Sequence, residues 1–263
     1  MATKAIGIDI GGTGIKGALV DLRTGDLLSD RIKKPTPKGG EPEDIVEVAT
    51  ALVAELASDA PDAPVGVCFP AVVLDGRTMS AANVSKKWIG LEAEKLFERS
   101  MDRDIHFVND ADAAGVAEIR YGAAKGHRGV VMLTTLGTGI GTAIINDGVL
   151  LPNTELGHIE IDGRDAEHDA AYSAKERNDW DWKQWTKRLQ RYYSTLEALF
   201  SPDLFIVGGG VSKHYDEFLP LLELRAPIIP AVLRNNAGIL GSAALTSPAF
   251  ATADEPVHED TRS

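Results

Sequence analysis

The chemistry suggested by this sequence starts at residues 9–17, a glycine-rich stretch that also carries Asp9, Thr13 and Lys16. Glycines let backbone N–H groups approach an anionic oxygen where a Cβ atom would block them. Lys16 adds a positive charge, Thr13 a hydroxyl, and Asp9 a carboxylate that could hold a hydrated Mg²⁺ beside phosphates. The stretch therefore predicts a phosphate-binding loop, whose expected contacts are Gly11, Gly12, Thr13, Gly14 and Lys16.

Two further glycine segments follow along the chain. The sequence Gly-Thr-Gly-Ile occurs at 12–15 and again at 137–140, each time before an apolar stretch, which indicates duplication of one hairpin. Thr138 and Gly139 are the expected phosphate contacts of the second copy. Gly208, Gly209 and Gly210 follow an apolar stretch, and they indicate either close approach of the backbone to a ligand or a plain strand-to-helix turn.

Alternating apolar stretches and helical patterns predict an α/β protein. The expected strands are 5–8, 18–22, 64–69, 104–108, 129–136 and 204–207, with a further strand after the turn at 24–25; residues 71–90 are expected to be irregular. The expected helices are 43–58, 91–101, 111–121, one near Lys213 and 237–245, and Trp182–Leu199 has an apolar stripe at helical spacing, serving as core or as a dimer face.

The first glycine loop formally matches the dinucleotide-binding pattern G-x-G-x-x-G at residues 12–17. That motif requires a helix directly after the glycines, and here a strand and the turn at Thr24-Gly25 follow. A Walker A loop is excluded as well, because Lys16 is followed by Gly17 and is not preceded by glycine. We therefore expect a β-hairpin to hold the phosphate.

Asp110 is the candidate general base because it comes directly after the strand 104–108, where α/β folds collect catalytic groups. The alternative is helix capping, with Asn109 as the N-cap and the carboxylates of Asp110 and Asp112 favoured by the helix dipole. We assign catalysis to Asp110 and capping to Asp112.

Composition limits the function classes. Of the 263 residues, 44% are hydrophobic and 25% charged, which is typical of a soluble globular protein, and no apolar run could span a bilayer. The formal charge of −12 argues against binding to nucleic acid or to an anionic membrane. Cys68 is the only cysteine, which excludes internal disulfides and a cysteine-built zinc cluster. We expect a cytoplasmic protein, since no signal-type segment is present.

The three glycine segments in this order resemble the sugar kinase/Hsp70/actin superfamily. Asn109-Asp110 and Glu155-Leu156-Gly157-His158 resemble its ROK family of bacterial sugar kinases. The stretches that resemble the polyphosphate glucokinase subgroup, which includes polyphosphate/ATP glucomannokinases, are Ser85–Gly90, Asp162–Glu167 and Pro230–Asn235. The resemblance covers residues 5 to 246. It implies a two-lobed actin-like ATPase (ribonuclease H-like) fold with duplicated β-hairpin phosphate loops and a cleft between the lobes.

The resemblance also implies an activity and a set of ligands. The expected reaction transfers a phosphoryl group from polyphosphate and/or ATP to the 6-hydroxyl of glucose, or of mannose, with Mg²⁺ near Asp9. The expected sugar contacts are Asn83, Asn109, Asp110, Glu155, His158 and Glu167. Glu167 depends on the path of residues 159–180, which stand where typical ROK members have a zinc motif; here His158 is expected to bind sugar without a metal.

Several assignments have alternatives that the sequence leaves open. Glu155 and His158 could be an ordinary loop glutamate and a satisfied histidine, and Asn83 could only shape a turn. Lys86 and Lys87 form either a solvated patch or a contact for a polyanionic donor, and we assign Lys87 to the donor; the weaker candidates are Lys33, Lys34 and Lys38.

The expected organisation is a smaller lobe of residues 1–108 plus 236–247, a larger lobe of 109–235, a disordered tail of 248–263 and assembly as a homodimer. One alternative function is an ATP-only ROK hexose or N-acetylhexosamine kinase. The other is a non-catalytic sugar sensor, which we consider poorer because such repressors carry an N-terminal helix-turn-helix and the first strand is expected at residue 5.

Overall fold

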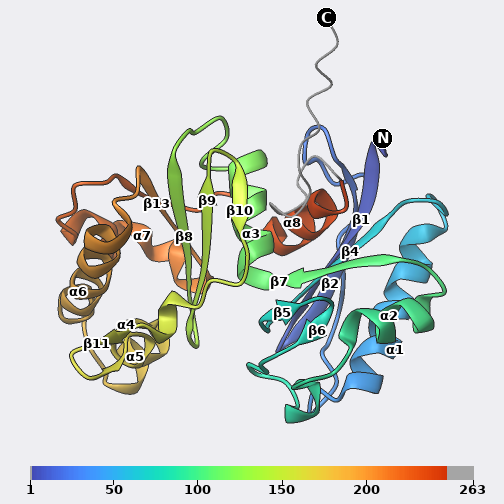
Figure 1. Cartoon of the computed structure of the whole chain (residues 1–263), viewed down its shortest axis with the longest axis horizontal. Helices are drawn as coiled ribbons and strands as arrows, with labels where there is room; N and C mark the ends of the chain where they lie inside the picture. The colour runs from blue at the N-terminus through green and yellow to red at the C-terminus, as the bar shows by residue number, and fades with distance from the viewer. Residues whose placement is uncertain (1, 248–263) are drawn as a thin grey trace, which may run out of the picture.

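The computed structural model describes residues 2–247 as two five-stranded sheets that lie side by side, with α3 and α8 between them (Figure 1). The first sheet contains β1 (Lys4–Gly11), β2 (Gly14–Asp21), β3 (Ile32–Lys34), β4 (Val65–Phe69) and β7 (Ile105–Asn109). The second contains β8 (Val130–Leu136), β9 (Ile140–Asn146), β10 (Val149–Leu151), β13 (Leu204–Gly208) and β14 (Ile228–Pro230). Two small hairpins pair β5 (Val73–Leu74) with β6 (Arg77–Thr78), and β11 (Glu160–Ile161) with β12 (Arg164–Asp165).

The helices cover these sheets and fill the space between them. They are α1 (Pro42–Ala57), α2 (Ala93–Met101), α3 (Asp110–Arg120), α4 (Glu167–Ala170), α5 (Tyr172–Arg177), α6 (Trp182–Phe200), α7 (Tyr215–Phe218) and α8 (Ala237–Leu245). Short 3₁₀ turns occur at Lys86–Trp88, Leu156–His158, Gly210–His214, Leu219–Leu221 and Arg234–Asn236. No helix within residues 2–247 is long and apolar enough to cross a membrane.

The two large sheets have the same topology. The strand order is β3-β2-β1-β4-β7 in one and β10-β9-β8-β13-β14 in the other. In each, three antiparallel strands are followed by two parallel ones. The predicted duplication is therefore confirmed over the whole sheet and not only over the hairpins.

The two glycine hairpins differ in their turns. Gly11 pairs with Gly14, so Gly12 and Thr13 form a two-residue turn, whereas residues 137–139 form a three-residue turn between β8 and β9. Because a strand follows the glycines in both copies, the rejection of a dinucleotide-binding motif is confirmed.

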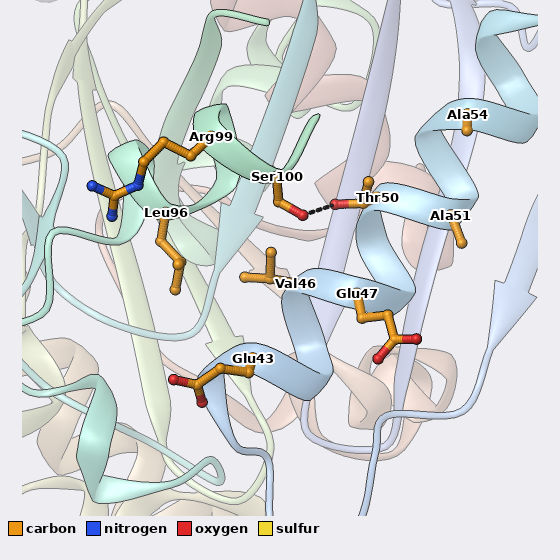
Figure 2. A pocket seen from close by; sticks show the side chains of 9 residues that line it. All are labelled: Glu43, Val46, Glu47, Thr50, Ala51, Ala54, Leu96, Arg99 and Ser100. Carbon is orange, nitrogen blue, oxygen red and sulfur yellow. Dashed lines mark hydrogen bonds between the residues drawn. The ribbon is translucent and has the colours of Figure 1, made fainter. Parts of the chain in front are cut away.

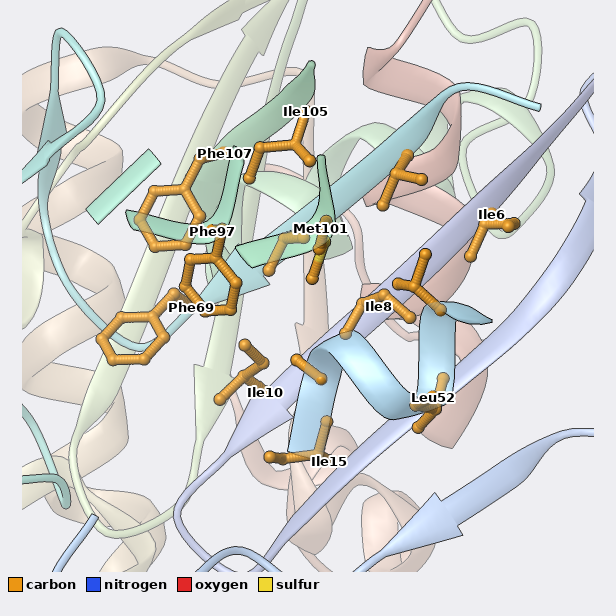
Figure 3. Close-up of a cluster of buried hydrophobic side chains, with 14 of the residues drawn as sticks. Ile6, Ile8, Ile10, Ile15, Leu52, Phe69, Phe97, Met101, Ile105 and Phe107 are labelled. Atoms are coloured by element: carbon orange, nitrogen blue, oxygen red, sulfur yellow. The ribbon is translucent and has the colours of Figure 1, made fainter. Parts of the chain in front are cut away.

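The first core lies between the first sheet and the helices α1 and α2. Side chains alternate across a strand, so Ile6, Ile8 and Ile10 of β1 all face this cluster (Figure 3). Phe69 and Phe107 of the neighbouring parallel strands pack beside them, with ring centroids 5.7 Å apart. This face of the sheet is built from large apolar side chains.

On the opposite face of the same sheet, α8 lies directly against glycines of β1 and β4. A Cβ atom added to Gly7 or Gly66 would overlap backbone atoms of α8, at Ile239 and Ser242 respectively. On its other side α8 meets α3, where a Cβ atom added to Gly241 would overlap the carbonyl of Ala113. The last helix, predicted at 237–245, therefore joins the first sheet to α3.

The aromatic stripe of α6 is core. Trp185, Leu189, Tyr192, Tyr193 and Leu196 are buried among the side chains of the second sheet, α4, α5 and α7. Of the predicted stripe only Leu199 is largely exposed, at 61%. The alternative of a dimer face does not apply to the buried residues.

Several predicted boundaries need correction. α2 begins at Ala93 rather than 91, because residues 88–91 form a turn with a hydrogen bond from the N–H of Leu91 to the carbonyl of Trp88. The strand expected after the turn at 24–25 is reduced to a bridge between Val20 and Leu27, and β3 begins only at Ile32. The irregular segment 71–90 contains the β5–β6 hairpin, and the helix near Lys213 is a 3₁₀ turn followed by α7. The tail predicted for 248–263 lies outside the described residues.

The close contact of α8 with α3 makes a testable prediction. We expect Gly241→Ala to lower the free energy of unfolding by about 2 kcal/mol. Overpacking costs about 3 kcal/mol at the upper end of its usual range, which applies to an overlap with backbone, and the helix propensity of alanine returns about 1 kcal/mol. Chemical denaturation measures the change. The control is Gly137→Ala, where an added Cβ meets no atom within 4 Å. Equal stability of Gly241→Ala and wild type would contradict this packing.

Candidate active site

The junction of β7 and α3 positions Asn109 and Asp110. Asn109 Oδ1 accepts hydrogen bonds from the backbone N–H groups of Ala111 (2.8 Å) and Asp112 (3.0 Å), and its Nδ2 donates to the carbonyl of Ala71 (3.0 Å). The capping role considered for Asn109 is therefore present. Asp110 is the first residue of α3, is half-buried, and accepts a hydrogen bond from the N–H of Ala111 (2.8 Å).

Two cavities meet at Asp110. A cavity of about 740 Å³ lies between the 70–89 segment and the second sheet, and a cavity of about 410 Å³ continues toward α8 and β13. Both are lined by Asp110, Ala111, Thr135 and Gly209. A ligand in either cavity would therefore reach the same carboxylate.

The predicted residues divide between these cavities. The larger one is lined by Asn83, Asn109, Asp110, Thr138, Gly139, Glu155, His158 and Glu167, which include all six predicted sugar contacts. The smaller one is lined by Asp9, Lys16, Gly208, Gly209 and Gly210. The structure thus brings together most of the candidates from distant parts of the chain.

The turn of the first hairpin is not part of either cavity lining. Gly11, Gly12, Thr13 and Gly14 line neither cavity, and Gly12 and Thr13 are exposed to solvent. The turn nevertheless lies against the larger cavity, because a Cβ atom added to Gly12 would be 3.0 Å from the Cβ of Asn83. The backbone N–H groups of this turn are therefore beside the cavity rather than in its wall.

Burial and a neighbouring carboxylate control the charge of Asp110. Burial and the negative charge of Asp9 raise the pKa of Asp110 to about 7, and the hydrogen bond from Ala111 opposes the shift. Asp9 itself forms an ion pair with Lys16 (3.0 Å). The site therefore contains one compensated carboxylate and one that readily takes up a proton near neutral pH.

His158 gathers three carboxylates at the other end of the larger cavity. Its Nδ1 lies 3.1 Å from Asp165 and 3.9 Å from Glu167, and its Nε2 lies 3.8 Å from Glu155. Burial opposes protonation, but the hydrogen bond to Asp165 and the charges of Glu167 and Glu155 outweigh it, so the pKa of His158 is raised. Burial also raises the pKa of Glu155.

Glu167 lines the larger cavity and belongs to residues 159–180. These residues stand where the sequence comparison expects typical ROK members to have a zinc motif. This segment forms β11, β12, α4 and α5, and Glu167 is the first residue of α4. Its carboxylate accepts a hydrogen bond from the N–H of Ile140 (3.0 Å), and Gly139 leaves room for this approach. Glu167 is thereby fixed against the second glycine hairpin.

Lys86 and Lys87 point to different places. Lys86 lines the larger cavity, whereas Lys87 forms an exposed ion pair with Glu41 (2.8 Å) and lines neither cavity. Lys87 would have to leave Glu41 to touch a donor.

The smaller cavity is also lined by Lys213, Arg234 and Asn235, which were not predicted as site residues. All three follow parallel strands of the second sheet, β13 and β14, at the edge where α/β sheets bind ligands. That position is the signal that could have identified them. They add two positive charges to a cavity that already contains Lys16.

The acidic groups determine how a metal could be held. Within the described residues no group of three or more His, Cys, Asp or Glu side chains is arranged to hold a metal ion. Mg²⁺, however, commonly keeps several waters and binds through one or two carboxylates together with substrate phosphates. Asp9, which lines the smaller cavity, fits that mode.

A third hollow, of about 600 Å³, lies on the outer face of α1 and α2 (Figure 2). Its lining contains none of the candidate site residues. Its polar groups include Thr50 and Ser100, which hydrogen bond to each other (2.9 Å).

Comparison with known proteins identifies sugar kinases as the relatives of this chain. A polyphosphate glucokinase of Mycobacterium tuberculosis (strain ATCC 25618 / H37Rv) is 48% identical over 238 residues, which cover 90% of this chain and 89% of the relative. The crystal structure of the inorganic polyphosphate/ATP-glucomannokinase from Arthrobacter sp. strain KM is 53% identical, has a TM-score of 0.86, and matches 94% of this chain and 100% of that chain.

A more distant solved structure is the ROK family glucokinase from Streptomyces griseus in complex with glucose and AMPPNP. It is 26% identical, has a TM-score of 0.78, and matches 92% of this chain and 98% of that chain. These likenesses confirm the predicted two-lobed actin-like ATPase fold. The model of the ROK family matches residues 5–176, and the chain therefore belongs to the ROK family.

Proposed function

We propose that this protein transfers a phosphoryl group from polyphosphate or ATP to the 6-hydroxyl of glucose, and also of mannose. The observation that carries the proposal is the position of Asp110 at the junction of two cavities, one with the predicted sugar residues and one with Lys16 and the glycine run. Polyphosphate glucokinase and polyphosphate/ATP-glucomannokinase relatives at 48% and 53% identity support it.

Asp110 is the general base of the proposed reaction. The 6-hydroxyl oxygen attacks the terminal phosphorus, the bond from that phosphorus to the bridging oxygen of the donor breaks, and the hydroxyl proton passes to the Asp110 carboxylate. Glu155, His158 and Glu167 bind the remaining sugar hydroxyls together with Asn83. Asn109 contributes the one amide hydrogen left free after its three hydrogen bonds.

The donor phosphates lie where positive charge and glycine backbone converge. Lys16, Thr138 and Gly139 are the proposed contacts to the transferring group, and Gly208–Gly210 contact the donor in the smaller cavity. The first hairpin turn, Gly11–Gly14, which lies beside Asn83 of the larger cavity, would have to move toward the donor to contribute its N–H groups. A hydrated Mg²⁺ held by Asp9 would neutralise charge on the donor phosphates. Lys213 and Arg234 extend the positive charge along the smaller cavity.

Closure of two lobes protects the donor from water in this proposal. The lobes are residues 1–108 plus 236–247 and residues 109–235. The enzyme would act in the cytoplasm, as a homodimer, at the entry of glucose into glycolysis.

A matrix of substrates and donors tests the proposed function. Purified protein is incubated with glucose, mannose and N-acetylglucosamine, each with ATP or polyphosphate and Mg²⁺, and sugar phosphate is measured. We expect turnover of glucose with both donors. Turnover with ATP alone would identify an ATP-only kinase, and turnover of the N-acetylated sugar without glucose would contradict the proposed substrate.

Asp110→Asn keeps the size of the side chain but removes the proton acceptor. We expect kcat to fall by about 10²–10⁴-fold, the usual contribution of a general base, with the Kd for glucose little changed. Steady-state kinetics and calorimetry measure the two effects. Asp102→Asn, at an exposed left-handed helix end that asparagine also tolerates, is the matched control. An Asp110→Asn enzyme with wild-type kcat would remove Asp110 as the base.

The pH dependence of the reaction follows from the pKa of Asp110. The base acts only when ionised, and its pKa is raised to about 7, so kcat/KM for glucose should fall as pH drops through 7, by about tenfold for each unit below it. A pH–rate profile with saturating donor measures this limb. A profile that stays flat down to pH 5 would contradict either the role or the raised pKa of Asp110.

Variants of Lys86 and Lys87 test whether these two neighbouring lysines form a track, that is, a row of contacts to the polyanionic donor. We expect Lys86→Ala and Lys87→Ala each to raise the KM for polyphosphate by up to about fivefold, the effect of one exposed ion pair, while the KM for ATP changes less. Lys95→Ala is the control, because Lys95 forms a similar exposed pair with Glu92 (3.0 Å). Equal changes for both donors would argue against the track.

A further inference from the structure

The side chain of Asn153 joins two walls of the larger cavity. Its Oδ1 accepts a hydrogen bond from the N–H of Val73 (2.8 Å), and its Nδ2 donates to the carbonyl of the same residue (2.8 Å). Val73 directly follows Pro70–Val72, which line the cavity from the first half of the chain. Asn153 lies two residues before Glu155, which lines the cavity from the second half.

Asn153 is itself held firmly in place. Its backbone is left-handed (φ 58°), and its N–H donates to Asp112 Oδ2 (2.8 Å). Asp112 is only 2% exposed on α3, so this anchor is inside the protein. The carbonyl of the next residue, Thr154, accepts a hydrogen bond from Thr142 Oγ1 in β9 (2.6 Å). The amide group of Asn153 therefore extends from a rigid base.

The opposite wall is fixed by bonds to the site itself. The carbonyl of Ala71 accepts the hydrogen bond from Asn109, the residue before Asp110. The N–H of Val72 donates to Ser80 Oγ (2.9 Å). Together with the bonds to Asn153, these bonds give each residue from 71 to 73 a hydrogen bond between its backbone and a side chain.

We propose that Asn153 is a positioning residue that sets the width of the sugar cavity by tying the 70–73 segment to the segment that carries Glu155. This inference rests on the proposed function, because it assigns the larger cavity to the sugar. Asn153 itself lines neither cavity, so its effect on the sugar is indirect, through Val73 and Glu155. Asp112, whose buried carboxyl lies two residues from Asp110, has a purpose in this arrangement: it orients Asn153.

Two variants separate the role of the side-chain hydrogen bonds to Val73 from the role of the left-handed backbone at Asn153. Asn153→Gly removes both side-chain hydrogen bonds, and Asn153→Asp replaces the donor with a carboxylate oxygen that faces the carbonyl of Val73. Glycine and aspartate both tolerate the left-handed backbone, so a role limited to the turn predicts wild-type kinetics for both variants. Asp179→Gly is the control, at an exposed residue whose backbone is also left-handed (φ 50°) and whose side chain makes no hydrogen bond within the described residues.

We expect the KM for glucose to rise by about tenfold in Asn153→Gly and Asn153→Asp, because two hydrogen bonds that hold the cavity wall are lost. The KM for the donor should stay near that of wild type, and Asp179→Gly should leave both constants unchanged. Wild-type KM for glucose in both variants, or equal rises for sugar and donor, would overturn the proposal.

Hydrogen exchange provides a readout that does not require activity. The amide of Val73 should exchange faster in Asn153→Gly than in wild type, whereas amides of the two five-stranded sheets should not change. Unchanged exchange at Val73 would show that the tie is absent and would overturn the proposal. Failure of wild type to phosphorylate glucose would contradict the proposed function instead, and Val73 exchange would still decide whether Asn153 holds the wall.

Discussion

The structure depends on holding Asp110 close to a second carboxylate, Asp9, in a partly buried place. Two like charges at such a site repel, and burial makes each ionised form less favourable. Lys16 compensates Asp9 through an ion pair of 3.0 Å, whereas the hydrogen bond at the start of α3 compensates Asp110 only in part. The result is an asymmetric pair, in which Asp9 is ion-paired with Lys16 and the pKa of Asp110 is raised to about 7.

That pair comes from two distant parts of the chain, and α8 brings them together. Asp9 lies near the end of β1 and Asp110 begins α3. α8 touches both elements through positions without side chains: a Cβ atom added to Gly238 would be 2.8 Å from Cγ of Asp9, and one added to Gly241 would overlap Ala113 of α3. The glycines of β1 and α8 therefore set the separation of the two carboxylates. The geometry of the two carboxylates is a consequence of backbone packing.

Much of the fold and site could be predicted from the sequence, because the relevant signals are local. The repeated Gly-Thr-Gly-Ile segments predicted the duplicated hairpins. Positions at the ends of predicted strands indicated Asp110 and the glycine run at 208–210, which line the smaller cavity. The resemblance to ROK sugar kinases added Glu155, His158 and Glu167, which the structure gathers around one cavity. The aromatic spacing of α6 identified its buried face but could not decide between core and interface, since both bury the same side chains.

The parts that the sequence could not supply depend on contacts between distant residues. Nothing local shows that Lys87 pairs with Glu41 while Lys86 lines the cavity, or that the turn at Gly12 and Thr13 lies beside the cavity wall. The role of Asn153 also cannot be predicted from the sequence, because asparagine near a turn is common and its partner, Val73, is 80 residues away. Such residues are found only when both walls of the site are seen at once.

Burial and Asp9 together raise the pKa of Asp110 to about 7, and this raised pKa is what the proposed general base depends on. The most direct test follows the side-chain carboxyl of Asp110 by ¹³C NMR in labelled wild-type protein and in Asp9→Asn, with Asp110→Asn to assign the signal. We expect the pKa of Asp110 to be about 7 in wild type and lower in Asp9→Asn, because the negative charge of Asp9 is removed. A wild-type pKa near 4, the usual value of an aspartate in water, would contradict it.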